Sequence, residues 1–113
     1  SVIVADTDKA LEFYSGVLGL EVDDSRPKMA YPGAWLKVGA GQIHLLELPN
    51  PDPVQGRPEH GGRDRHLALS VSDLDIAISA LEERAMSYTL SSSGRRALFC
   101  RDVDGNAVEL VEK

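Results

Sequence analysis

The chain has 113 residues, the size of one ordinary domain, and it is 42% hydrophobic and 27% charged, as typical globular proteins are. A net charge of −6 argues against the basic surface that general nucleic-acid binding requires. No apolar run of about 18 residues is present, and the single cysteine excludes an internal disulfide. We therefore expect a cytoplasmic domain with no nucleic-acid or membrane partner.

The first half of the chain predicts one strand, one helix and three further strands. Residues 2–5 form the first strand, and Asp6 stands where a helix N-cap would accept backbone N–H groups. Strand-like runs follow at 18–22, 33–38 and 42–48. The helix between them buries an i, i+3, i+4, i+7 stripe made of Ala10, Phe13, Tyr14 and Val17.

The second half repeats this order. A strand begins at His66, Asp73 takes the N-cap position, and strand-like runs follow at 87–90, 95–100 and 106–111. The last two runs are separated by an Asp-Gly turn. The predicted buried stripe of the second helix is Leu74, Ala77, Ile78 and Leu81. The pattern β-α-β-β-β therefore occurs twice.

A segment rich in turn residues joins the halves. Residues 49–65 hold four of the six prolines and three of the ten glycines. About 50 residues alone bury too little surface to be stable. We therefore predict a single domain over 1–113, in which a module at about 1–48 and a module at about 66–113 share one core across the linker 49–65.

Three polar residues interrupt apolar strands at related places. His44 and Glu109 occupy matching positions in the last strands of the two halves, and His66 opens the first strand of the second half. Each could be a separately hydrogen-bonded core residue. Imidazole and carboxylate groups converging from different strands would instead suit a divalent metal such as Zn, Ni, Co, Mn or Fe.

The whole chain resembles the vicinal oxygen chelate superfamily, also called the glyoxalase/bleomycin resistance protein/dioxygenase superfamily. The resemblance rests on "VADTDKALEFYSGVLGLEV", "HLALSVSDLD" and "LFCRDVDGNAVELVE". The last is the most specific, because a hydrophobic strand, a D-x-DGN turn and an x-x-E-L strand occur together. The resemblance implies an α+β fold in which two βαβββ modules form a curved mixed sheet that cups a metal and substrate site.

Matched to the family pattern, His66, Glu109 and His44 are the implied metal ligands, and Glu109 and His44 the implied catalytic residues. His44 stands where glyoxalases and methylmalonyl-CoA epimerases usually have Glu, which puts in doubt a glyoxalase I mechanism with Glu as the base. A fourth ligand is expected in the first strand of the first module. That position falls two places before Ser1, so we expect a ligand upstream of this sequence.

The resemblance implies a divalent-metal-dependent enzyme, with a glyoxalase-like lyase or isomerase acting on a small oxygenated substrate as the first choice. The metal would stabilise an enolate or oxyanion. An extradiol dioxygenase or a thiol transferase would use a similar centre. A metal-free drug-binding protein like the bleomycin resistance proteins is the alternative outside enzymes. Exposed sheet edges and an apolar cup predict a homodimer.

Other residues carry weaker expectations. The candidate substrate-binding residues are Arg95, Arg96, Trp35 and Tyr31, although two strand-edge arginines are often only solvated and an aromatic in "GAWL" is often core. His60 lies in the Pro/Gly-rich linker and is expected to be solvated rather than a ligand. Cys100 is expected to be a buried core thiol and not a nucleophile.

Overall fold

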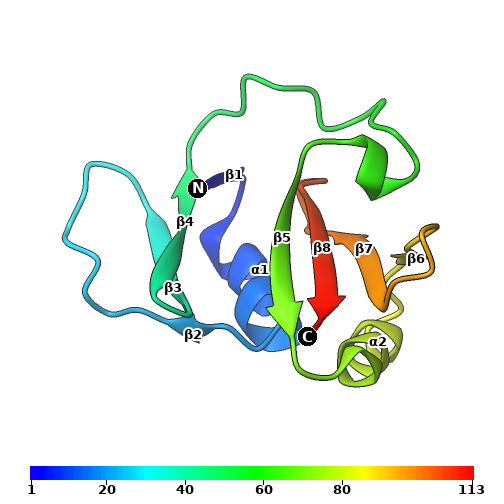
Figure 1. The fold of residues 1–113 in the computed structure, drawn as a ribbon. Helices are drawn as coiled ribbons and strands as arrows, with labels where there is room; N and C mark the ends of the chain where they lie inside the picture. Colours follow the sequence, from blue (N-terminus) through cyan, green and yellow to red (C-terminus); the bar gives the residue numbers. More distant parts are fainter. The chain divides into compact units, whose positions relative to one another are not determined.

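A computed structural model describes residues 1–113, which form two compact units, Ser1–Pro53 and Val54–Lys113. Each unit is described by itself. Figure 1 shows that the element order β-α-β-β-β predicted for each half is present in both units. Each unit holds a four-stranded sheet with both parallel and antiparallel pairing, and the fold class is α+β, as predicted.

The first unit contains the sheet β1-β4-β3-β2, in which β1 is parallel to β4 and the other neighbours are antiparallel. Ala34, Leu36, Ile43 and Leu45 of β3 and β4 are buried, and the alternate residues of both strands are more exposed. One face of this sheet therefore packs into the core. The elements are β1 (Val2–Val4), α1 (Thr7–Leu11), η1 (Glu12–Val17), β2 (Glu21–Val22), β3 (Gly33–Val38) and β4 (Gly41–Glu47).

The first helix begins and is buried as predicted. Asp6 accepts a hydrogen bond from the backbone N–H of Lys9 at 3.1 Å, which caps α1. The helix then widens in η1, a π-helical segment in which the backbone N–H of Leu18 reaches the carbonyl of Phe13, five residues back, at 2.9 Å. The residues of the predicted stripe, Ala10, Phe13, Tyr14 and Val17, are all buried.

The second unit contains the sheet β5-β8-β7-β6, with β5 parallel to β8. Its helix α2 is capped by Asp73, which accepts from the backbone N–H of Asp75 at 2.9 Å. Of the predicted stripe, Leu74 and Leu81 are buried, whereas Ala77 and Ile78 are half-buried. The elements are η2 (Gly61–Arg63), β5 (His66–Val71), α2 (Leu74–Glu83), β6 (Thr89–Leu90), β7 (Ala97–Arg101) and β8 (Ala107–Glu112).

The fourth strand of each sheet is shorter than its sequence pattern predicts. β2 and β6 each contain two residues, although the apolar runs cover 18–22 and 87–90. In both runs the residues outside the strand lie in the short segment between the end of the helix and the strand. In the second unit the end of the helix places Ala85 at a φ of 52°, in the left-handed region that favours glycine.

The linker segment next to β5 is held to the second unit by one arginine. Arg101 donates to the Asp64 carboxylate at 2.8 Å and to the carbonyls of Gly105 and Pro58, each at 2.7 Å. These bonds fix the approach of the chain to the first residue of β5. Neither the length nor the hydrophobicity of any helix would allow it to span a bilayer.

Candidate metal and substrate site

Strand register brings His66 and Glu109 together in the second unit. Ala68 is paired with Glu109 across β5 and β8, and His66 lies two residues before Ala68, on the same face of the sheet. The Nε2 atom of His66 is 3.9 Å from the Oε2 atom of Glu109. Two of the predicted ligands therefore meet on the face of the sheet that also carries Phe99, the antiparallel partner of Glu109.

A backbone hydrogen bond sets which nitrogen of His66 is free. Its Nδ1 lies 2.8 Å from the carbonyl oxygen of Asp64, and a carbonyl can only accept, so Nδ1 carries the proton. In the neutral ring Nε2, the atom facing Glu109, then holds the lone pair. Asp64 is itself held by a hydrogen bond from Arg101 at 2.8 Å, and this bond lowers the pKa of its carboxyl below the ordinary value. This is the arrangement that orients metal-binding histidines.

The distance between the two atoms can be compared with that in a metal site. A divalent ion about 2.1 Å from each ligand, at angles between octahedral and tetrahedral, needs its two ligand atoms about 3.0 to 3.4 Å apart. The observed 3.9 Å would have to close by roughly 0.5 to 0.9 Å. A change of that size is within the reach of side-chain rotation, so the donor pair fits a divalent cation.

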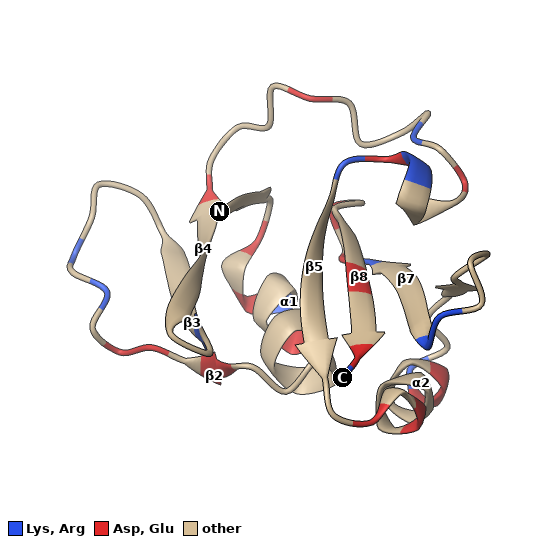
Figure 2. Cartoon of the chain, in the orientation of Figure 1, with Lys and Arg blue, Asp and Glu red and all other residues tan.

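The carboxylate of Glu109 already has a counter-charge. Its side chain is only 9% exposed, and Nη2 of Arg95 donates to its Oε1 at 2.8 Å. Figure 2 shows the basic residues at the start of β7 and the acidic position within β8. Arg95 is in turn held by Ser93, whose hydroxyl accepts from Nε at 3.0 Å. Glu109 thus offers Oε1 to Arg95 and Oε2 to the His66 side.

His44 occupies the equivalent place in the first unit. It is paired across β3 and β4 with Trp35, and the two rings stack with centroids 4.2 Å apart and planes 6° from parallel. The Nε2 atom of His44 is 3.0 Å from Oε1 of Gln42, whose Nε2 donates to Asp23 at 2.7 Å.

The bond to Asp23 settles the direction of the hydrogen bond to His44. A carboxylate accepts, so the NH₂ of Gln42 faces Asp23, and the amide oxygen faces His44 and accepts from its Nε2–H. In the neutral ring the lone pair of His44 is then on Nδ1. Within neither unit do three or more His, Cys, Asp or Glu side chains gather into a group that could hold a metal. The convergence of His44 with the pair in the other unit stays a prediction.

The remaining predicted residues are dispersed. Arg96 forms ion pairs with Asp75 and Glu112, each at 3.2 Å, on the side of the sheet where α2 lies. It therefore does not share the contact of Arg95 with Glu109. The guanidinium of Arg26 lies 5.8 Å from the ring centroid of Tyr31 and donates to the Tyr31 carbonyl. A role of Arg96 or Tyr31 in substrate binding stays a prediction.

His60 and Cys100 are more enclosed than free surface groups. The Nδ1 atom of His60 accepts from the backbone N–H of Gly62 at 3.0 Å, and its Nε2 is buried without a hydrogen-bond partner. This differs from the solvated side chain that the linker composition predicts.

Cys100 is a buried thiol, as predicted. It is 3% exposed, and burial, with a smaller contribution from Asp102, raises the pKa of its thiol to about 12.

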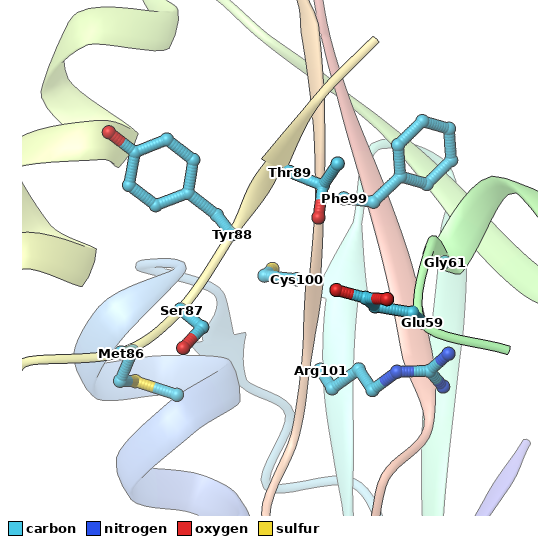
Figure 3. A pocket seen from close by; sticks show the side chains of 9 residues that line it. All are labelled: Glu59, Gly61, Met86, Ser87, Tyr88, Thr89, Phe99, Cys100 and Arg101. Carbon is cyan, nitrogen blue, oxygen red and sulfur yellow. The ribbon is translucent and has the colours of Figure 1, made fainter. Parts of the chain in front are cut away.

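A cavity of about 220 Å³ opens at the edge of the second sheet. Figure 3 shows the segment 86–89 on one side of it and Glu59, Gly61 and Arg101 on the other. Phe99 lines this cavity while its ring also meets His66 edge-on, with centroids 5.2 Å apart. Phe99 is therefore shared between the lining of the cavity and the surroundings of His66.

Several residues that contact the candidate site residues or line the cavity were not predicted from the sequence. Gln42 shares a strand face with His44, two residues away, so strand alternation contained a signal for that contact. Glu59 and Ser93 lie in loop segments whose composition carries no such signal. The bond between Arg95 and Glu109 depends on the register of β7 against β8, which the sequence alone does not specify.

Comparison with known proteins connects this geometry to a family. The family model described as "Glyoxalase/Bleomycin resistance protein/Dioxygenase superfamily" matches residues 1–110. Glyoxylase I 4 from Arabidopsis thaliana is 28% identical over 97% of this chain, which spans 66% of the length of that protein.

Two solved structures share the fold at lower identity. The fosfomycin resistance protein FosX from Listeria monocytogenes, a mutant complexed with Mn(II) and a dihydroxypropylphosphonic acid, is 18% identical, with a TM-score of 0.75 over 98% of this chain and 86% of its own. TnmS3, an antibiotic binding protein from a Streptomyces species, is 22% identical, with a TM-score of 0.69 over 98% of this chain and 89% of its own. The fold is thus shared by a metal-bound resistance protein and an antibiotic binder.

Proposed function

The chain belongs to the glyoxalase/bleomycin resistance protein/dioxygenase superfamily, and on that premise we propose that it is a divalent-metal-dependent enzyme, a glyoxalase-like lyase or isomerase acting on a small oxygenated substrate. The observation that carries this proposal is the pair of His66 Nε2 and Glu109 Oε2, 3.9 Å apart, with the other histidine nitrogen held by a backbone carbonyl. Both atoms offer lone pairs to the same space.

In this proposal His66 and Glu109 hold the metal, and His44 completes the set. When bound, a divalent cation supplies a Lewis acid that stabilises negative charge on adjacent substrate oxygens. The protein contributes orientation and proton transfer. Glu109 and His44 are the groups proposed to move protons, and for His44 the hydrogen bond to Gln42 leaves Nδ1 as the nitrogen that accepts one. Arg95, Trp35 and Tyr31 are proposed to contact substrate.

The first experiment is metal analysis of protein purified without chelator. We expect a stoichiometric divalent ion in the wild type and its loss in His66→Ala and Glu109→Ala. Turnover is then followed by NMR as exchange of the C–H proton next to the carbonyl in small 2-hydroxycarbonyl compounds in D₂O. A wild type without metal after reconstitution, or exchange that persists in His66→Ala, would refute the proposal.

A metal-free binding protein is the second candidate, and one observation favours it. Glu109 and His66 already have protein partners, Arg95 and the carbonyl of Asp64, so the pair is satisfied without a cation. In that case a planar or cationic drug should bind the chelator-treated protein as tightly as the reconstituted one. Binding that requires added metal would exclude this candidate.

We further propose a homodimer. Each sheet ends in a two-residue edge strand that exposes an aliphatic side chain, Val22 in β2 and Leu90 in β6, which are 37% and 58% exposed. Exposed apolar sheet edges are commonly covered in proteins. Light scattering at micromolar concentration should give twice the chain mass, and a monomer mass would contradict this proposal.

A further inference from the structure

Arg95 is the arginine that pairs with the candidate ligand Glu109, so it is more than a solvated residue at the sheet edge. Its guanidinium donates through Nη2 to Oε1 of Glu109 at 2.8 Å and through Nε to Ser93 at 3.0 Å. The Arg95 side chain is 54% exposed, whereas the carboxylate that it contacts is 9% exposed. An accessible cation therefore neutralises a buried anion.

We propose that Arg95 is an internal counter-ion that weakens divalent-metal binding at the His66–Glu109 pair and is drawn off by an anionic group of the substrate. This inference rests on the proposed function, because it assumes that the pair binds a metal. It adds a substrate class, since it requires that the substrate carry a carboxylate, phosphate or similar anion.

The reasoning is electrostatic. A buried carboxylate needs a positive partner, and in the absence of metal Arg95 supplies it. A cation arriving beside Oε2 must then share the carboxylate with a guanidinium that repels it. An anion that binds the exposed side of Arg95 relieves this repulsion, so the anion and the metal should each strengthen binding of the other.

The neighbouring arginine provides a matched control. Arg96 has the same charge and a similar exposure, 52%, but it pairs with Glu112 and Asp75 rather than with Glu109. Replacing it alters the net charge of the protein as replacing Arg95 does. A difference between the two variants therefore reports the contact with Glu109 and not overall charge.

The experiment titrates Co²⁺ into chelator-treated wild type, Arg95→Gln and Arg96→Gln, using visible absorption, with and without inorganic phosphate. We expect Arg95→Gln to bind Co²⁺ more tightly by about 5- to 150-fold, the usual range of coupling between two sites, and Arg96→Gln to match the wild type. Phosphate should tighten Co²⁺ binding in the wild type and have less effect in Arg95→Gln. Melting curves should show a larger stabilisation by Co²⁺ in Arg95→Gln, because the metal replaces the missing counter-charge.

Unchanged or weaker Co²⁺ binding in Arg95→Gln overturns the inference, as does an equal effect of phosphate in both proteins. If Arg95→Gln does not fold without metal, Ser93→Ala is used instead, because it removes the hydrogen bond that holds Arg95 but keeps the charge. Tighter Co²⁺ binding in Ser93→Ala supports the inference, and unchanged or weaker Co²⁺ binding overturns it. A wild type that binds no Co²⁺ refutes the proposed function as well, so the two failures are distinguishable.

Discussion

The carboxylate of Glu112 accepts a hydrogen bond from the backbone N–H of Leu74 at 2.9 Å, so the last strand of the second unit caps the first turn of its own helix. Glu47 makes the equivalent contact with Thr7 in the first unit, at 2.8 Å from the backbone N–H and 3.1 Å from the hydroxyl. A helix N-terminus carries N–H groups without partners in the helix, so a carboxylate from a neighbouring strand satisfies one and faces the positive end of the dipole.

The first prediction concerns these strand-to-helix caps. Glu47→Ala should lower the free energy of unfolding by about 1 kcal/mol, the size of a lost helix cap. Glu47→Gln should cost less, because the amide oxygen can still accept from Thr7. Urea denaturation of the two variants measures the difference. Equal losses in both would mean that the charge, and not the hydrogen bond, is what stabilises.

The second prediction concerns Ala85, which ends α2 at a φ of 52°. The backbone N–H of Met86 donates to the carbonyl of Leu81 at 2.9 Å, closing the helix in the manner of a glycine C-cap. A side chain in the left-handed region costs roughly 1 kcal/mol, and glycine removes that strain. Ala85→Gly should therefore raise the melting temperature. Ser79→Gly, at an exposed position inside the helix, serves as the control and should lower the melting temperature.

Local signals explain how much of this fold could be predicted. Asp6 and Asp73 cap their helices because N-cap chemistry involves only neighbouring residues, and the buried stripe of the first helix follows from its period. The convergence of His66 and Glu109 could be anticipated from the repeat and the family resemblance. The bond from Arg95 to Glu109 could not, because Arg95 and Arg96 lie in the bend before β7, where strand alternation does not apply, and only the path of that bend brings Arg95 to Glu109.

The exact hydrogen bonds of the two histidines could not be derived from the sequence, although alternation along β4 indicated that Gln42 neighbours His44. A carbonyl in the linker fixes the His66 ring, and a side-chain amide fixes the His44 ring. These contacts depend on the backbone path of the linker and on one rotamer of Gln42. The path of the linker leaves no periodic trace in the sequence, and strand alternation places Gln42 beside His44 without fixing its rotamer.

The third prediction follows from Asp23. Hydrogen bonds from Ser25, and after them the bond from Gln42, lower the pKa of this carboxyl to about 2 from an ordinary 3.8. A lowered folded-state pKa means that this contribution to stability is complete above about pH 4 and is lost as the pH falls toward 2. Asp23→Asn should flatten the decline of melting temperature over that window. A decline identical to the wild type's would show that other carboxyls account for it.

The fourth prediction concerns the thiol of Cys100. With a pKa of about 12, almost none of it is ionised at pH 8, and it is 3% exposed. Because the thiolate is the reactive form, alkylation by iodoacetamide in the folded protein should be roughly a thousandfold slower than that of free cysteine. Rapid labelling in urea is the control. Fast labelling without denaturant would place Cys100 among reactive thiols rather than core residues.

The last prediction concerns His44. If it is a metal ligand, His44→Ala should lose metal and turnover while the melting temperature of the metal-free protein changes little, because its ring lies on the more exposed face of β4. His44→Glu should keep the metal, since carboxylates are also ligands for these cations.

The stack on Trp35 and the bond to Gln42 provide the competing explanation, in which His44 only orders the surface of the sheet. In that case His44→Ala lowers the melting temperature of the metal-free protein and leaves metal content unchanged. Gln42→Leu further separates the ligand explanation from the structural one, because removing the amide frees the His44 ring to change tautomer. If His44 is a ligand, the Co²⁺ spectrum should then change. If His44 is only structural, the spectrum should stay the same.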